Sequence, residues 1–349
     1  MARVIHGGVT VAELREAEAQ GIALIDLSAS LNPYGPHERV VAAARTAVLE
    51  RYPEPDAATL RNRYAEAAVV DPCQVLAGNG STEVLYLLCQ AFARQSSTAL
   101  IVGPTFGEYR AAAEAAGMTV AEVRAEPPEF ALPEVALSEA IQELRPGLVF
   151  LCNPNNPTGL LVPRSVLYRM HQCVVDAGGV LVVDEAYMDF AWPRDERMQP
   201  APGLALVRSL TKLHAVPGLR LGFLAAEPGI IAAVERLQPC WSVSAPAAAA
   251  GLQALNERAF ADESRELVAA TRAHVQRALS VAGIPTGPSS ANFVLLRAGD
   301  APRVRKALLQ RGWVVRDCSS FGLPTHIRVA IPRAGQADRL LGDLLECVS

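Results

Sequence analysis

Short runs of consecutive apolar residues alternate with longer amphipathic stretches through the middle of the chain. Four runs have the length of buried strands: TALIVG (98–103), GLVFLCNP (147–154), VLVVDEAY (180–187) and LALVRSL (204–210). Helical patterns lie between or before them: STEVLYLLCQAFA (81–93), GEYRAAAEAAG (107–117) and VPRSVLYRMHQCVVDAGG (162–179). This alternation predicts an α/β fold with a mostly parallel sheet covered on both faces. Ligands of such sheets bind beyond the carboxyl ends of the strands, so the residues that follow each run are the functional candidates.

The pattern changes from about residue 262. A long amphipathic helix (262–283) is followed by three strand-like stretches and a closing helix: 290–298, 313–317, 326–331 and 334–348. This order predicts a second, smaller α+β domain. We therefore expect an N-terminal arm (1–35) that packs with the small domain, a large domain (36–240) and a small C-terminal domain (241–349).

Composition excludes several classes of function. The net charge of −4 and the lack of a basic run do not suit a nucleic-acid-binding protein. No apolar run has the length of a signal peptide core or a membrane span, which predicts a soluble cytoplasmic protein with no membrane partner. The seven cysteines form no C-x-x-C pair, so we expect reduced thiols and no metal site.

Lys212 is an unusual residue for this chain. It lies in SLTKLHAVPGLRLGF (209–223), and of the 32 lysines and arginines only Lys212 and Lys306 are lysines. A guanidinium keeps its proton and is a poor nucleophile, whereas an amine can form a covalent bond. The choice of lysine here therefore indicates amine chemistry.

Polar groups gather where the predicted strands end. NPNNPTG (153–159) could be a tight turn, Asp184 a solvated carboxylate, and GNGSTE (78–83) a helix cap. At one edge of one sheet, however, they combine with Lys212 to give an amine, a carboxylate, an amide and an anion cradle. That set matches the needs of pyridoxal 5′-phosphate.

Each candidate has a role in such a site. Catalysis would fall to Lys212, which forms a Schiff base with the aldehyde, to Asp184, which keeps the pyridine nitrogen protonated, and to Tyr187. Asn156 and Tyr187 would donate to the phenolic oxygen, and Tyr109, or alternatively Phe106, would cover the ring. The phosphate would be held at a helix N-terminus and by nearby donors: Gly80, Ser81, Thr82, Ser209, Thr211 and Arg220.

Three ordered motifs, SLTKLHAVPGLRLG, NPNNPTG and VVDEAYMDF, resemble those of the class I/II aminotransferases, within the fold-type-I pyridoxal-phosphate superfamily. The resemblance runs from about residue 5 to the end. It implies a large domain with a mostly parallel seven-stranded sheet, a small α+β domain, and a homodimer with sites at its interface. It also implies that Tyr52 in ERYPEPD reaches the cofactor phosphate of the neighbouring subunit.

Two branches of this family compete, and the primary expectation is the threonine-phosphate decarboxylase branch of cobalamin biosynthesis. Four stretches resemble it: IHGG (5–8), LIDLSASLNPYGP (24–36), VRSLTKLHAVPGLRLGFL (207–224) and VVRDCSSFGLP (314–324). The reaction would convert O-phospho-L-threonine, with O-phospho-L-serine as a second candidate, to the amine phosphate. The alternative is a 2-oxoglutarate-dependent aminotransferase for histidinol phosphate or an aromatic amino acid, because FGLP resembles that branch and His214 departs from the usual aromatic.

Both readings imply a small phosphorylated substrate. By family position Arg328 resembles the arginine that binds substrate carboxylate, and Arg316 one that binds phosphate; the alternative is two ordinary surface arginines. His6 and Asn32 resemble residues near the substrate phosphate, and Asn156 also faces substrate. The bond that stands perpendicular to the cofactor ring breaks, so the positions of the anion-binding groups would decide between decarboxylation and transamination.

Overall fold

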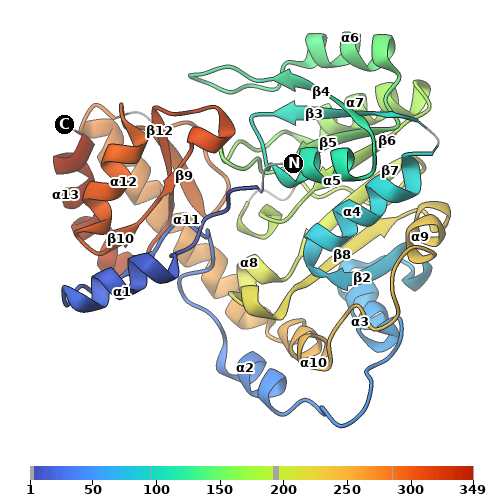
Figure 1. Cartoon of the computed structure of the whole chain (residues 1–349), viewed down its shortest axis with the longest axis horizontal. Helices are drawn as coiled ribbons and strands as arrows, with labels where there is room; N and C mark the ends of the chain where they lie inside the picture. Colours follow the sequence, from blue (N-terminus) through green and yellow to red (C-terminus); the bar gives the residue numbers. More distant parts are fainter. Residues whose placement is uncertain (1–3, 95, 192–195, 285, 349) are drawn as a thin grey trace.

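The computed structural model describes residues 4–94, 96–191, 196–284 and 286–348. A seven-stranded sheet forms the centre of the larger part (Figure 1). In spatial order its strands are β2 (Val75–Asn79), β8 (Leu221–Ala226), β7 (Leu204–Ser209), β6 (Val180–Asp184), β5 (Leu148–Cys152), β3 (Thr98–Gly103) and β4 (Thr119–Arg124). The pairs among β7, β6, β5, β3 and β4 are parallel, whereas β8 is antiparallel to both of its neighbours. The predicted mostly parallel α/β sheet is confirmed.

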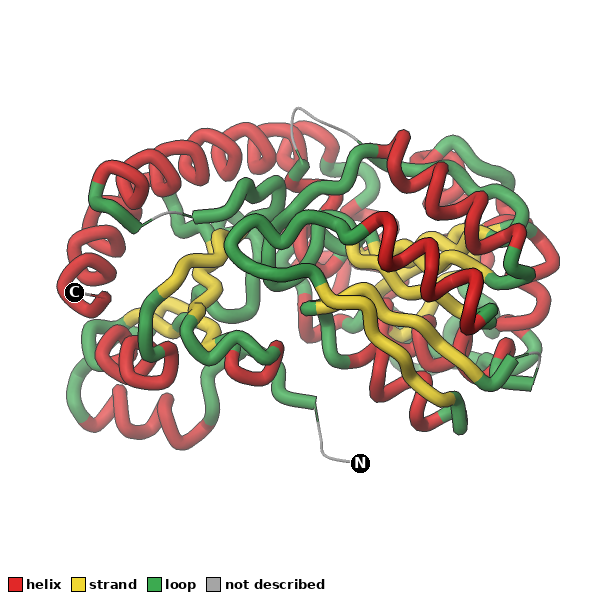
Figure 2. Tube along the Cα trace, turned by 90° about the horizontal axis from the view of Figure 1, so that it is seen from above, coloured by secondary structure: helices red, strands yellow, loops and turns green. Residues whose placement is uncertain are grey.

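Helices cover both faces of this sheet, as Figure 2 shows. The helices of the larger part are α2 (Glu38–Arg45), α3 (Ala58–Ala68), α4 (Gly80–Phe92), α5 (Glu108–Ala115), α6 (Glu134–Leu144), α7 (Arg164–Asp176), α8 (Thr211–His214), α9 (Pro228–Glu235) and α10 (Ala245–Ala254). The ends of the predicted strands and helices agree with the structure within a few residues.

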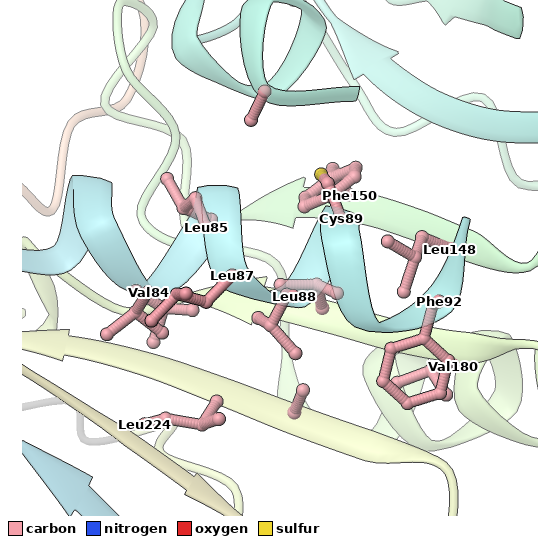
Figure 3. Close-up of a cluster of buried hydrophobic side chains, with 14 of the residues drawn as sticks. Val84, Leu85, Leu87, Leu88, Cys89, Phe92, Leu148, Phe150, Val180 and Leu224 are labelled. Carbon is pink, nitrogen blue, oxygen red and sulfur yellow. The ribbon is translucent and has the colours of Figure 1, made fainter. Parts of the chain in front are cut away.

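The strands are apolar throughout because both faces are buried. Phe150 and Val182 pack with α4 on one face, while their neighbours Val149 and Leu181 pack with α7 on the other. Figure 3 shows the first of these clusters, in which Leu88 of α4 points toward Leu224 of β8. Successive strand residues point to opposite faces, so continuous apolar runs are the expected sequence for a doubly covered sheet.

Three strands of the large sheet lie outside the four predicted runs: β4 and β2 at its edges, and β8 between β2 and β7. The edge strand β4 has exposed and half-buried residues along its length, including Glu122 and Arg124, and charged residues suit an edge strand. At the opposite edge, β2 runs directly into α4 at Gly80, so its five residues merge with the predicted helix start. Only β4 lacks the continuous buried run of a central strand, whereas β8 has such a run, buried at every position, outside the predicted strands.

The smaller part has its own antiparallel sheet, in the order β11 (Arg316–Asp317), β12 (His326–Ala330), β9 (Phe293–Arg297). Its helices are α11 (Arg258–Val281), α12 (Ala301–Leu309) and α13 (Ala334–Val348). A separate core lies among them, with Trp313, Val294 and Leu344 fully buried.

The stretch 313–317 is two strands rather than the single one that the sequence predicts. β10 (Trp313–Val314) pairs in parallel with β1 (Ile25–Asp26) of the N-terminal arm, and β11 pairs with β12 instead. The backbone changes partners at Val315, because the arm competes for one edge of the segment. The arm also carries α1 (Val11–Ala19), and in Figure 1 it runs beside the smaller part.

The helix α10 lies on the large sheet, although the predicted division assigns it to the small domain. Its residues Ala247, Ala250 and Ala254 belong to the cluster that includes Leu60 of α3 and Phe223 of β8. We propose that the boundary between the two parts lies between α10 and α11, after this cluster ends.

Candidate active site

A cavity of about 590 Å³ opens where the carboxyl ends of the parallel strands meet the small sheet and the N-terminal arm. Most of the predicted site residues line it: His6, Gly80, Ser81, Thr82, Tyr109, Asn156, Asp184, Tyr187, Ser209, Thr211, Lys212, Arg220, Arg316 and Arg328. Residues from the arm, the large sheet and the small sheet thus meet in one place. Two predicted residues, Asn32 and Tyr52, are not among those that line it.

Lys212 lies in the single turn of α8, directly after β7. Its Nζ donates a hydrogen bond to the carbonyl of Ala29 at 3.3 Å and lies 5.6 Å from the centre of the Tyr187 ring. An ammonium group has three N–H donors, and this contact uses one of them. The other donors can therefore bind a ligand in the cavity.

Asp184 ends β6 and is 4% exposed. Its Oδ2 accepts from the hydroxyl of Tyr109 at 2.8 Å and its Oδ1 from the amide of Ala186 at 3.0 Å. Burial raises the pKa of Asp184, while these two hydrogen bonds and the charge of Lys212 lower it. A desolvated carboxylate on a cavity wall is suited to hold a protonated ring nitrogen.

Tyr109 is hydrogen-bonded to Asp184 and also lines the cavity. It is 0% exposed, its ring stacks on Phe150 with centroids 5.3 Å apart, and burial raises its pKa well above the ordinary value. Phe106 is only partly buried, packs edge-on against Tyr109 at 5.6 Å and also lines the cavity. Both aromatic residues therefore stay candidates for the ring cover, Tyr109 as predicted and Phe106 as the alternative.

The N-terminus of α4 forms a tight cradle beside Arg220. Gly80 has a φ of 78°, and a Cβ there would lie 2.5 Å from Nη2 of Arg220. A Cβ on Gly222 would lie 2.3 Å from the amide nitrogen of Ser81, so both positions require glycine. Backbone amides at a helix N-terminus together with a guanidinium make an anion site.

The hydroxyl side of the same cradle comes from the end of β7. Ser209 and Thr211 are both buried, and the Ser209 hydroxyl accepts from the amide of Thr211 at 3.2 Å. The Thr211 hydroxyl makes only a long bond of 3.4 Å, to the carbonyl of Leu221. Both side chains therefore keep hydrogen-bonding capacity toward the cavity.

Arg316 and Arg328 lie directly opposite each other on β11 and β12, and both are buried. Arg316 donates to the carbonyl of Ile5 at 2.7 Å and to the hydroxyl of Ser320 at 2.6 Å. Burial, followed by the charge of Arg328, lowers the pKa of Arg316. Two like charges side by side in a buried place favour a bound anion.

Arg328 is surrounded by neutral partners. It donates to Oδ1 of Asn156 and, at 2.6 Å, to the carbonyl of Ser28, and its guanidinium lies 5.0 Å from the centre of the Phe293 ring. Its Nε is buried and has no hydrogen-bond partner among the described residues. The contact with Arg328 uses only Oδ1 of Asn156. The amide nitrogen of that side chain is left for its predicted role as a donor to the phenolic oxygen of the cofactor.

Asn32 is buried against the backbone of Lys212 and is not among the residues that line the cavity, and its contact with substrate remains a prediction. Its side-chain amide donates to the carbonyl of Leu213 at 2.8 Å, and its backbone amide donates to the carbonyl of Lys212 at 2.9 Å. Its Oδ1 accepts from the amide of Tyr34. The residue is 2% exposed, so both functions of its amide serve the fold of the arm against α8.

Tyr52 lies on the surface, 79% exposed, where its ring stacks on Trp241 with centroids 4.6 Å apart. It takes no part in the cavity of its own chain, and its predicted contact with a neighbouring subunit remains a prediction. His6 does line the cavity, and its Nε2 lies 2.7 Å from Oε1 of Glu108.

Several residues at the site carry no recognisable signal in the sequence: Glu108, Ser320 and the carbonyls of Ile5, Ser28 and Ala29. A carboxylate in the first turn of a helix reads as an ordinary capping residue, and a backbone carbonyl carries no residue-specific signal. Only the meeting of distant segments brings them to the cavity.

The donor set fits pyridoxal phosphate. An amine, a buried carboxylate, and a glycine cradle that a Cβ would fill match the aldehyde, ring nitrogen and phosphate of that cofactor. Among the described residues, no group of three or more histidine, cysteine or acidic side chains is placed to hold a metal ion. In the same part of the chain, every helix is too short or too polar to cross a membrane.

Comparison with known proteins agrees with this geometry. A family model described as aminotransferase class I and II matches residues 22–344. A histidinol-phosphate aminotransferase of Symbiobacterium thermophilum is 37% identical over 324 residues, covering 91% of this chain and 89% of that protein. A threonine-phosphate decarboxylase of Salmonella typhimurium is 36% identical over 361 residues, covering 97% and 95%.

The fold has solved counterparts. The histidinol-phosphate aminotransferase of Sinorhizobium meliloti, in complex with pyridoxal 5′-phosphate, superposes with a TM-score of 0.85 at 22% identity, covering 98% of this chain and 95% of that one. This likeness shows the fold-type-I architecture. With the matching family model, the chain belongs to the class I and II aminotransferase family and is an enzyme with pyridoxal 5′-phosphate as its cofactor.

Proposed function

We propose that this enzyme acts on a small amino compound that carries a phosphate group. The observation that carries the proposal is the pair Arg316 and Arg328, which are buried, lie opposite each other on β11 and β12, and line the cavity. Their charges are matched only by neutral groups, and Nε of Arg328 lacks a partner among the described residues. A substrate with two anionic groups would replace the backbone carbonyls and supply the missing charge.

The residues of the chain would divide the chemistry as follows. When bound, pyridoxal phosphate supplies an electron sink for negative charge at the substrate carbon that bears the amine. Lys212 would hold the cofactor and then carry a proton to or from that carbon. Asp184, oriented by Tyr109, would hold the proton on the ring nitrogen, and Tyr187 would donate to the phenolic oxygen.

The substrate end would orient the bond that breaks. Arg328 would hold a carboxylate, and Arg316 with His6 would hold the phosphate. The reaction then depends on which bond these contacts turn perpendicular to the ring plane, because only that bond shares its electrons with the ring. Small differences in the positions of Arg316 and Arg328 would separate transamination from decarboxylation.

Transamination of histidinol phosphate with 2-oxoglutarate is the activity that the relatives favour. Several histidinol-phosphate aminotransferases stand among them at 30–37% identity. The two arginines would then bind the phosphate of one substrate and the carboxylates of the other in turn.

Decarboxylation of O-phospho-L-threonine, the primary expectation from the sequence, is the second candidate. The observation in its favour is the position of the arm: its two motifs that resemble the decarboxylase branch, IHGG and LIDLSASLNPYGP, contribute His6, Gly7, Ser28, Ala29 and Leu31 to the cavity. The threonine-phosphate decarboxylase of Salmonella typhimurium is also similar over nearly the whole chain.

Two incubations distinguish these activities. Holoenzyme with O-phospho-L-threonine and no keto acid should release carbon dioxide if it is a decarboxylase, and O-phospho-L-serine would test the contribution of the methyl group. Holoenzyme with histidinol phosphate and 2-oxoglutarate should yield glutamate if it is an aminotransferase. If the holoenzyme turns over none of these three phosphorylated compounds, the proposed substrate class is contradicted.

We also propose that the enzyme is a homodimer in which Tyr52 reaches the cofactor phosphate of the neighbouring subunit. The support in this chain is the exposed pair Tyr52 and Trp241, which are 79% and 46% exposed and stacked on each other. Sedimentation should give a particle of two chains, and Tyr52→Ala should weaken cofactor binding. A monomer with full cofactor affinity would contradict this proposal.

A further inference from the structure

Glu108 is a buried carboxylate at the edge of the cavity with no role in the steps above. It begins α5 and is 8% exposed. Its Oε1 lies 2.7 Å from Nε2 of His6, and its Oε2 accepts from the hydroxyl of Tyr86 at 3.0 Å. In the described part of the chain, no arginine or lysine pairs with it, so His6 is its one partner able to carry a positive charge.

The chemistry of the three groups determines the direction of each hydrogen bond. A carboxylate accepts, so Nε2 of His6 must carry a hydrogen and donate it. Burial, followed by the hydrogen bond to Glu108, raises the pKa of Tyr86, which therefore remains a hydroxyl donor. With both oxygens engaged, the carboxylate of Glu108 cannot rotate freely, and it holds the imidazole ring in one orientation.

The backbone of His6 adjoins the residue that the proposed phosphate-binding arginine contacts, and both side chains line the cavity. His6 follows Ile5, whose carbonyl accepts from Arg316 at 2.7 Å, and its ring centre lies 5.8 Å from that of Phe106. The side chain is 50% exposed and lines the cavity. Among the described residues Nδ1 has no hydrogen-bond partner, so the second ring nitrogen remains available to a ligand.

We propose that Glu108 is a positioning residue that makes the enzyme select substrates with a phosphate group, by holding His6 next to Arg316. This inference rests on the proposed function, because it assigns the phosphate to that wall of the cavity. When both ring nitrogens carry a hydrogen, His6 donates from Nε2 to Glu108 and from Nδ1 to a phosphate oxygen. Holding the ring in place avoids the cost of ordering a mobile side chain on binding.

Glu108→Gln tests the proposal in the holoenzyme, because it keeps the shape of the side chain and removes its charge. We expect KM to rise about tenfold for the phosphorylated substrate, with kcat and the cofactor absorbance unchanged. The unphosphorylated counterpart, L-threonine or histidinol, should be handled as by the wild type. Glu114→Gln is the matched control, since Glu114 lies on the same helix in an exposed pair with Arg110.

A double-mutant cycle separates positioning from a general structural effect. If Glu108 acts through His6, then Glu108→Gln in a His6→Ala background should add no further loss. Additive losses, or an equal loss for phosphorylated and unphosphorylated compounds, would overturn the proposal.

Titration of the holoenzyme with inorganic phosphate keeps this test independent of the reaction. In the holoenzyme the cofactor's own phosphate would fill the α4 cradle, so added phosphate would report on a second anion site. Weaker binding by Glu108→Gln and His6→Ala, but not by Glu114→Gln, would support the positioning role even if neither proposed substrate is turned over. Equal binding by Glu108→Gln and the wild type, or no phosphate binding, would overturn it.

Discussion

Asp184 and Arg316 are both buried charged residues on the wall of the same cavity, but their partners differ in kind. Asp184 accepts hydrogen bonds from the hydroxyl of Tyr109 and from the backbone amide of Ala186, two residues further along the chain. Arg316 is bonded to Ser320 and to the backbone of Ile5, which belongs to the arm. Both partners of Asp184 therefore belong to the larger part of the chain, whereas Arg316 depends on a segment about 300 positions away.

This difference has a physical consequence for ligand binding. At the cofactor end, the polar groups are oriented before any ligand arrives, because packed strands hold them. At the substrate end, an anion must displace carbonyls of the arm from Arg316 and Arg328. Substitutions at the first end should therefore alter cofactor chemistry, and those at the second should alter substrate affinity.

The largest effect is expected for Lys212→Ala at the cofactor end. The variant lacks the amine that bonds the cofactor and moves the proton, so turnover should fall by about 10³-fold or more. The absorbance of the lysine-linked cofactor should disappear. Lys212→Arg keeps the charge without the nucleophilic amine and should behave alike; a retained lysine-linked band in either variant would contradict the assignment.

Arg328→Lys tests the substrate end. Lysine cannot reproduce the planar fork that reaches Ser28, Asn156 and a carboxylate together, so kcat/KM should fall by about 10²-fold. The cofactor absorbance should not change. Arg297→Lys is the matched control, because Arg297 is exposed on the adjacent strand β9. An equal loss of kcat/KM in this control would contradict a specific role of Arg328 in substrate binding.

His214 probes the packing behind the lysine, since it lies on α8 and is 4% exposed. Burial lowers the pKa of His214 from its ordinary 6.5 to about 4. The unfolded chain therefore takes up a proton below pH 6.5 that the folded chain does not, and stability is lost as the pH falls toward 4.

The expected loss from this residue is about 2 kcal/mol between pH 7 and pH 5. Urea unfolding of the holoenzyme gives the free energy of unfolding at both pH values. In His214→Phe this free energy should fall by about 2 kcal/mol less between pH 7 and pH 5 than it does in the wild type. His274→Gln, at an exposed position, controls for the removal of a histidine. An unchanged slope in His214→Phe would show that the cofactor end is less tightly packed than we infer.

The smallest effect is expected for Tyr109→Phe. Loss of the hydroxyl removes one of the two hydrogen bonds to Asp184 but leaves the stacking on Phe150, so kcat should fall about tenfold. KM for the substrate should change little, because Tyr109 does not reach the arginines. A change in KM alone would indicate that the two ends are coupled more closely than their hydrogen bonds suggest.

The cofactor end could be predicted from the sequence because its signals are local. Lys212, Asp184 and Gly80 each stand at the end of a strand or the start of a helix, and parallel strands bring such positions to one edge. The role of Tyr109 could not be predicted, because its partner Asp184 is 75 positions away and the orientation of its ring depends on packing against Phe150.

The substrate end followed from resemblance only in part. Arg316 and Arg328 line the cavity, whereas Asn32 lies outside its lining and donates to the carbonyl of Leu213 in α8. The split of 313–317 into β10 and β11 likewise depends on competition between the arm and β12 for the same backbone. Hydrogen bonds to backbone carbonyls leave no trace in residue identity.

The sequence by itself determined which segments are strands and helices, which residues stand at their ends, and the family to which the motifs belong. These properties depend on apolar periodicity and on residue types within a few positions of each other. Only the tertiary structure decided that Glu108 holds His6, that the arm closes on the two arginines, and that α10 packs on the large sheet. Such contacts arise from the packing of distant segments, whose free energy depends on shape and burial rather than on local pattern.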